Sequence, residues 1–380
     1  MKKSTTFCPW DDDNYMGEDL TTEIQSQDED EDIITLPDDI APEKVSQTQL
    51  IAGDLIALNS ELSQKIFHQS TGEWSDVINK RKPIVLVEEE PRRVLTKSGW
   101  RSIPKPLAEV SAHLTINKNV AAAVKRCIEN SSLESFDEIV LEACATHQYL
   151  GKDYITVNTI FKYMGGNGDP DTKMRQQIID SVDKLRGLDI RIDATEAYKK
   201  LERLQCPIGK PKRKPDKQGR IVLVDNLLSA KRLEIEVDGH ILDAIKFKDV
   251  SPIFLYTQDK GETQVLSQKL LAASRLRATK NFIALKHYIL CRIRSIQRSQ
   301  KNGSDLKNTI TFQALYNNCG DPEKAKTDSK FRTRIREAAV EYLKVLVKEG
   351  EIKEFKCVDD NFQQHSEIAK CTKISIKFCC

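Results

Sequence analysis

Four basic residues crowd one short stretch near the C-terminus, KFRTRIREAAVEYL. Lys330, Arg332, Arg334 and Arg336 alternate with other residue types. Ammonium and guanidinium groups bind phosphate oxygens, and the start of a helix favours a phosphate as well. A solvated helix usually mixes charge signs at i,i+4 spacing, whereas here the acidic residues follow only after the first two turns. The stretch therefore suits a polyanion, with an ordinary solvated helix as the alternative.

An apolar stripe runs through the same stretch at helical spacing. Thr333 faces away from this stripe, with Arg332 and Arg336 on one flank and Lys330, Glu337 and the more inward Arg334 on the other. The basic residues are therefore predicted to face outward from a helix that packs on its other side. The stripe consists of Phe331, Ile335, Ala338, Tyr342 and Leu346.

The neighbouring segments predict the unit that positions this helix. Residues 281–296 read as an apolar helix, and ITFQALYNNCGD reads as a short helix with a Thr311 cap and a Gly320 stop. Alternating strands follow at 351–358 and 373–378. The order helix, short helix, turn, helix and two-stranded ribbon is typical of a winged helix, whose second helix enters the major groove of DNA.

The same order occurs earlier in the chain. ITVNTIFKYMGG, read as a short helix with a Thr156 cap and a Gly165-Gly166 stop, aligns with ITFQALYNNCGD at an offset of 155, and TKMRQQI then aligns with SKFRTRI. Such internal repetition indicates two similar units. The first predicted DNA-reading helix carries fewer basic residues, so the second unit is predicted to be the main reader. The first helix offers Lys173, Arg175, Gln176 and Gln177.

A basic, Pro- and Gly-rich segment, CPIGKPKRKPDKQGR, lies between predicted strands of the first unit. Lys212, Arg213 and Lys214 are its central basic residues. A long basic wing that contacts phosphates or the minor groove is one interpretation. A flexible solvated linker is the other.

The charge is divided unevenly along the chain. Of 59 Lys/Arg and 57 Asp/Glu in all, residues 1–60 hold three and fifteen, so the remainder has 56 basic and 42 acidic residues. A basic body suits a polyanionic partner, and an acidic head can compete for the same surface. We predict an α+β chain with two tandem winged-helix domains: an acidic disordered tail at 1–48, a mixed α/β extension at 49–130, and winged-helix domains at 131–258 and 259–380.

Enzymatic and metal chemistry is not indicated. No CxxC pair, no His-x-His pair and no GK[ST] after MGGNGD is present, which argues against a zinc ribbon, a rolling-circle nickase and a P-loop. Cys357, His365 and Cys371 are the weak alternative as metal ligands. No long apolar run or secretory leader is found. We predict a cytoplasmic, nucleoid-associated protein without cofactors, and not an enzyme.

Residues 130–378 resemble the replication initiator proteins of iteron-type plasmids and related phage elements. The resemblance rests on FDEIVLEACATHQYLGKDYITVNTIFKYMGG and on ATKNFIALKHYILCRIRSI. It implies sequence-specific binding to repeated origin DNA, self-repression, and recruitment of a host initiator and helicase. It also implies a homodimer formed through the first winged-helix domain. Residues 49–120 and the acidic head have no counterpart in that family.

Two other functions fit the same sequence. A winged-helix transcriptional regulator of a phage or mobile element would show the same pattern, because initiators also repress their own promoters. An interaction scaffold whose basic body pairs with its acidic head is the second. A salt titration separates the scaffold from a DNA-binding protein, because phosphate contacts make affinity fall as salt rises.

Overall fold

The structure is a computed structural model. It describes residues 53–96, 99–195, 221–237, 240–273, 276–301, 308–319, 321–365 and 367–378. The described residues all belong to one compact unit and form a mixed α+β fold, as predicted. The predicted acidic tail and the basic segment at 206–220 lie outside these residues.

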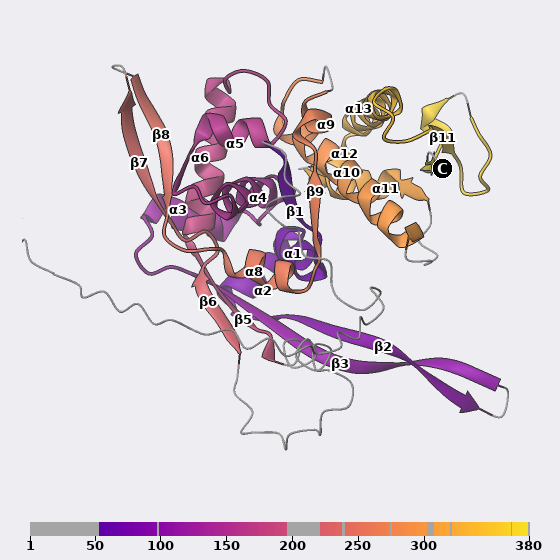
Figure 1. The fold of residues 1–380 in the computed structure, drawn as a ribbon, viewed down its shortest axis with the longest axis horizontal. Helices are drawn as coiled ribbons and strands as arrows, with labels where there is room; N and C mark the ends of the chain where they lie inside the picture. The colour runs from indigo at the N-terminus through magenta and orange to yellow at the C-terminus, as the bar shows by residue number, and fades with distance from the viewer. Residues whose placement is uncertain are drawn as a thin grey trace, which may run out of the picture. The chain divides into compact units, whose positions relative to one another are not determined.

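Two long helices pack against each other in the core (Figure 1). They are α4 (Ser135–Tyr149) and α10 (Lys280–Lys301). Helix α4 begins with a capping box, in which the backbone amide of Glu134 donates to Asp137 Oδ2 at 3.0 Å. Nearly all of α4 is buried, which explains why its sequence lacks a one-sided apolar pattern.

The second repeat begins after α10 and ends in a three-stranded antiparallel sheet of order β10-β12-β11. Three helices lie between its first and second strands. The elements are β10 (Thr309–Thr311), α11 (Phe312–Asn317), α12 (Pro322–Thr327), α13 (Ser329–Lys348), β11 (Glu354–Val358) and β12 (Lys373–Lys377).

The first repeat builds a sheet of equivalent order, β4-β8-β7. In each repeat a buried isoleucine of the first strand pairs with a buried isoleucine of the last: Ile155 with Ile245, and Ile310 with Ile374. The elements are β4 (Tyr154–Thr156), α5 (Val157–Tyr163), α6 (Thr172–Arg186), β7 (Ala230–Val237) and β8 (His240–Phe247).

Both repeats start their short helix at the predicted threonine. Thr156 accepts the Thr159 amide at 3.2 Å, and Thr311 accepts the Ala314 amide at 3.1 Å. Gly165, the predicted stop after α5, has φ +79, and a Cβ there would lie 2.6 Å from the Leu271 backbone. Glycine is therefore required at this turn.

The strands that flank the basic segment differ from expectation. We expected LDIRID and IVLVD to contribute to the ribbon of the first repeat. Instead β5 (Leu188–Asp193) and β6 (Val222–Asn226) join β2 (Ile84–Thr96) and β3 (Gly99–Ile116) in a four-stranded sheet of order β2-β3-β5-β6. The reason is burial: every second residue of β5 packs inward, namely Leu188, Ile190 and Ile192.

Apolar residues at helical spacing predict a helix over residues 49–67, but the described residues 53–67 are only partly helical. Leu55–Leu58 form strand β1, which pairs with β9 (Thr263–Leu266) and is buried along its length. Only α1 (Glu61–Phe67) is helical there, capped by Ser60. Because β1 and β9 lie about two hundred residues apart in the chain, local spacing does not reveal their pairing. The predicted domain boundaries stay predictions.

Four shorter helices and a 3₁₀ turn complete the described fold. None of the described helices is long and apolar enough to cross a membrane. The remaining elements are α2 (Thr71–Asn79), α3 (Ala122–Asn130), α8 (Pro252–Asp259), α9 (Gln268–Ala272) and η2 (Ile368–Lys370).

Candidate nucleic-acid interface

Asp328 is the N-cap of helix α13 and lies directly before the predicted basic stretch. Asp328 Oδ1 accepts the Phe331 amide at 3.0 Å. This hydrogen bond holds the pKa of Asp328 below its ordinary value. The cap places a carboxylate where a phosphate could otherwise bind, so phosphate contacts at this end must come from side chains.

Three of the predicted residues on α13 are exposed: Lys330, Thr333 and Arg334. The Thr333 hydroxyl donates back to the Ser329 carbonyl at 3.1 Å. The apolar stripe on the other face is buried as predicted, since Phe331 and Leu346 are 6% and 0% exposed. The exposed face therefore presents two cations and a hydroxyl on a helix whose opposite side is fixed by the core.

Arg336 lies on the same helix but contacts the protein itself. Its Nη1 donates to the carbonyls of Ile368 and Ala369 at 3.0 and 2.9 Å. Its Nε donates to the Tyr316 hydroxyl, and the guanidinium stacks 4.8 Å from the centre of the Phe312 ring. Arg336 thus ties α11, α13 and η2 together, and its positive charge is only partly exposed.

Arg332 caps the helix that precedes α13. Its Nη1 donates to the carbonyls of Ala325 and Lys326 at 2.9 and 3.1 Å, at the end of α12. The last carbonyls of a helix lack partners within the helix, and the helix dipole stabilises a cation placed beside them. Arg332 therefore holds α12 against the start of α13.

Helix α12 was not predicted from the sequence. Its start carries the usual signals, which are an N-cap Asp321, whose side chain accepts the Lys324 amide at 3.0 Å, and Pro322 in the first turn. Lys324 Nζ lies 5.3 Å from the centre of the Phe331 ring. The turn between α11 and α13 thus contains one more short helix with basic residues beside the candidate interface.

The matching residues of α6 are less available. Arg175 is half-buried, and its Nη2 donates to Asn158 Oδ1 at 2.9 Å. Gln176 is exposed but donates to Asp180 Oδ1 at 2.7 Å. Lys173 is exposed and Gln177 is half-buried. The second repeat therefore offers the more open basic surface.

Other predicted site residues lie elsewhere. Lys212, Arg213 and Lys214 fall outside the described residues. His365 Nε2 lies 2.9 Å from Asp359 Oδ2. Within the described ranges, no group of three His, Cys, Asp or Glu side chains could hold a metal ion.

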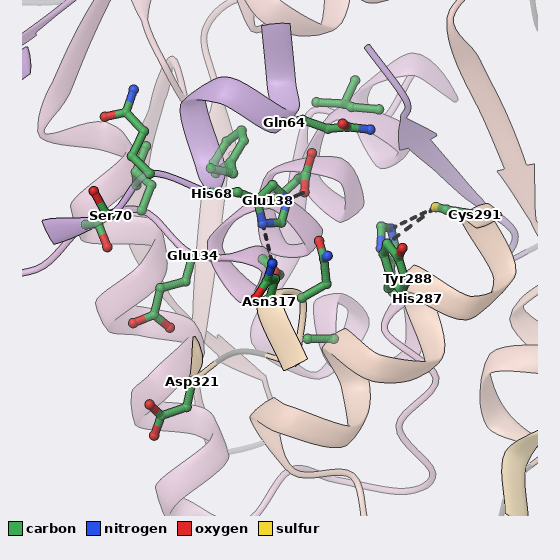
Figure 2. Close-up of a pocket in the computed structure, with 18 of the residues that line it drawn as sticks. Gln64, His68, Ser70, Glu134, Glu138, His287, Tyr288, Cys291, Asn317 and Asp321 are labelled. Carbon is green, nitrogen blue, oxygen red and sulfur yellow. Dashed lines mark hydrogen bonds and ion pairs between the residues drawn. The ribbon is translucent and has the colours of Figure 1, made fainter. Parts of the chain in front are cut away.

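A cavity of about 970 Å³ lies between α1, the start of α4, α10 and the α11–α12 turn. Figure 2 shows His68 beside Glu138, and His287 beside Cys291. His68 Nε2 lies 3.3 Å from Glu138 Oε2. The turn between α11 and α12 of the second repeat also lines this cavity, together with α4 and α10. Its lining residues are Asn317, Asn318 and Asp321.

A buried ion pair also joins α4 and α10. His287 Nε2 lies 2.6 Å from Glu142 Oε2, and Glu142 Oε1 accepts the Leu58 amide at 2.6 Å. Burial raises the pKa of Glu142 to about 7. Burial alone would lower the pKa of His287, but the neighbouring Cys291 and Glu142 raise it well above its ordinary value.

No protein-family model matches the chain, and no curated protein matches it. Two of the similar solved structures are of RctB domains 2 and 3. One, of selenomethionine derivatives of domains 2 and 3 of RctB, has TM-score 0.30 and 12% identity, covering 81% of this chain and 98% of that one. The other, of RctB domains 2-3, has TM-score 0.33 and 11% identity, covering 81% and 97%.

Proposed function

We propose that this chain is a sequence-specific DNA-binding protein in which two tandem winged-helix units contact the duplex and α13 is the main reading helix. The observation that carries the proposal is the exposed pair Lys330 and Arg334 near the N-terminal end of a helix in a helix-turn-helix arrangement. Helix-turn-helix proteins contact bases with this end of the second helix. The repeated sheet order and the basic body of the chain support the same proposal.

We propose further that the binding serves replication initiation at repeated origin sites, without catalysis by the chain itself. This step rests on the sequence resemblance described above. The alternative is a winged-helix transcriptional regulator of a phage or mobile element. Replication of a reporter plasmid from a cloned candidate origin separates the two, because a regulator would bind and repress without supporting replication.

Selection of bound sites from random DNA, followed by a salt titration, tests the DNA proposal. Affinity should fall with salt at a slope of about −0.9 per phosphate contacted. Lys330→Ala/Arg334→Ala should weaken binding by about tenfold or more and flatten that slope by up to about two.

The matched control is Lys344→Ala/Lys348→Ala. Both control residues are exposed on α13, and Lys344 lies about 15 Å beyond Arg334 at ~1.5 Å per residue. This control should leave site-specific binding nearly unchanged. Equal effects of the two double variants would defeat the assignment of the reading end. A chain that selects no DNA sequence and shows no salt dependence would defeat the proposal itself.

A further inference from the structure

Strands β2 and β3 form a two-stranded ribbon that extends beyond the rest of their sheet. They pair from Ile84–Ala112 at one end to Thr96–Gly99 at the other, and lie side by side along their length (Figure 1). The next strand, β5, pairs with β3 only over 111–116. Beyond that region the described ribbon has two strands.

The inner end of the ribbon is anchored in the core. Ile84, Leu86, Val110 and Ala112 are each at most 6% exposed. The outer part, from the Glu89–Pro106 pair to the Thr96–Gly99 pair, spans roughly 25 Å at ~3.3 Å per residue. Among the residues that the structure describes, no third strand pairs with the outer part. An isolated two-stranded ribbon is marginally stable in water, which favours a partner for the outer part.

The outer part has Glu89 and Glu90 at its inner end, and its tip, from the Pro91–Pro104 pair to the Thr96–Gly99 pair, is basic. The segment from Pro91 to Ala108 contains no Asp or Glu. Arg92 and Arg93 lie opposite Ile103 and Ser102 in the register, and Arg101 lies opposite Val94. Three arginines thus share the last few residue pairs, and the partner that such a charge favours is a polyanion.

Prolines argue against a protein strand as that partner. Pro91 lies opposite Pro104, and Pro106 lies opposite Glu89. Proline has no amide hydrogen to donate, so on both edges of the ribbon the hydrogen bonds that an added strand would need are interrupted. A second copy of the chain, or a peptide added as a strand, is therefore disfavoured.

We propose that the tip of the β2–β3 ribbon, from the Pro91–Pro104 pair to the Thr96–Gly99 pair, is a second DNA-binding element that contacts duplex next to the site read by α13. A two-stranded ribbon fits a DNA groove, and arginines bind phosphates and narrow minor grooves. The roughly 25 Å from the Glu89–Pro106 pair to the Thr96–Gly99 pair corresponds to about seven base pairs at ~3.4 Å per pair. The inference rests on the proposed function, since it adds a contact to the same complex.

The test uses the full chain and its selected site in two DNAs, one with about fifteen flanking base pairs on each side and one trimmed to the site. Arg92→Ala/Arg93→Ala/Arg101→Ala should weaken binding about tenfold on the long DNA and little on the trimmed DNA. The control Lys118→Ala/Lys125→Ala/Arg126→Ala removes equal charge from exposed positions and should not distinguish the DNAs. Equal loss on both DNAs, or no loss, overturns the proposal.

Hydroxyl-radical footprinting of the unaltered chain is a second measurement that needs no variant. Protection should extend up to about seven base pairs beyond the selected site and should shrink in the triple-arginine variant. Protection confined to the site overturns the ribbon contact. The Lys330→Ala/Arg334→Ala variant, measured alongside, shows which of the two proposals fails. If this variant binds DNA normally, the proposed function is wrong. If this variant loses binding but the triple-arginine variant does not, only the ribbon contact is wrong.

Discussion

His287 of α10 and Glu142 of α4 form an ion pair of 2.6 Å in the core, at 7% and 0% exposure. The same carboxylate accepts the Leu58 amide of β1. One buried proton therefore lies where three segments far apart in the chain meet. Removing one partner from such a pair leaves an uncompensated group in the core.

The pair should make stability fall as pH rises from 5.5 to 7.5. Burial lowers the pKa of His287, but Cys291 and the paired Glu142 raise it well above its ordinary value. The stability that the charged pair contributes is therefore present below the ordinary histidine pKa and is lost as pH rises through the raised pKa. Urea unfolding across this range should show a slope of up to about 1.4 kcal/mol per pH unit for one proton.

The control for this slope is Glu142→Gln/His287→Gln, which keeps the shapes and removes both titrating groups. Its unfolding free energy should depend less on pH than that of the unaltered chain. Parallel pH profiles would show that the pair is not the source of the slope.

Lys286 should reduce stability at neutral pH. It is 1% exposed, and its ammonium donates to the Leu271 carbonyl at 2.5 Å. Burial lowers its pKa to about 8. Lys286→Met should raise the free energy of unfolding by roughly 1–3 kcal/mol at pH 7, because a charged group leaves the core.

The pH dependence gives a second readout for Lys286. A lowered pKa means that the unfolded chain binds more protons between pH 8 and the ordinary lysine value, so stability should rise with pH in that window. Lys286→Met should abolish this rise. A methionine variant that is less stable at pH 7 would contradict the prediction.

The sequence was most informative where structure is local. Thr156 and Thr311 cap their helices as predicted, and the stripe from Phe331 to Leu346 is buried. These features depend on residues within one or two turns, which a pattern of spacing captures. The α+β class followed from the same local patterns.

Contacts between distant segments were not predictable in this way. The helical wheel placed Arg336 off the apolar stripe, which is correct, but gave no sign that the carbonyls of Ile368 and Ala369 bind it. Likewise nothing near Leu55 indicates that its strand pairs with Leu266. Such pairings are fixed by the tertiary fold and override local propensity.

Arg336 should matter for stability, and Arg334 for DNA. Arg336→Ala removes hydrogen bonds to two carbonyls and to the Tyr316 hydroxyl, so it should lower the free energy of unfolding by about 2–3 kcal/mol. Arg334→Ala, at an exposed position, should change it by less than about 0.5 kcal/mol while weakening DNA binding. Urea unfolding and DNA titration of both single variants check the distinction. Normal stability with lost binding in Arg336→Ala would instead favour a direct role of Arg336 at DNA.

The acidic head should weaken non-specific DNA binding. Residues 1–60 hold fifteen acidic and three basic residues, so at low salt they attract the basic body of the same chain. Deleting residues 1–48 should tighten binding to random DNA several-fold near 50 mM salt, and the gain should shrink near 200 mM because screening weakens the competition. A chain of the same length in which only the acidic residues of 1–48 are changed to Asn and Gln separates charge from bulk and should bind as the deletion does. Unchanged binding in both variants would mean that the head does not compete with DNA.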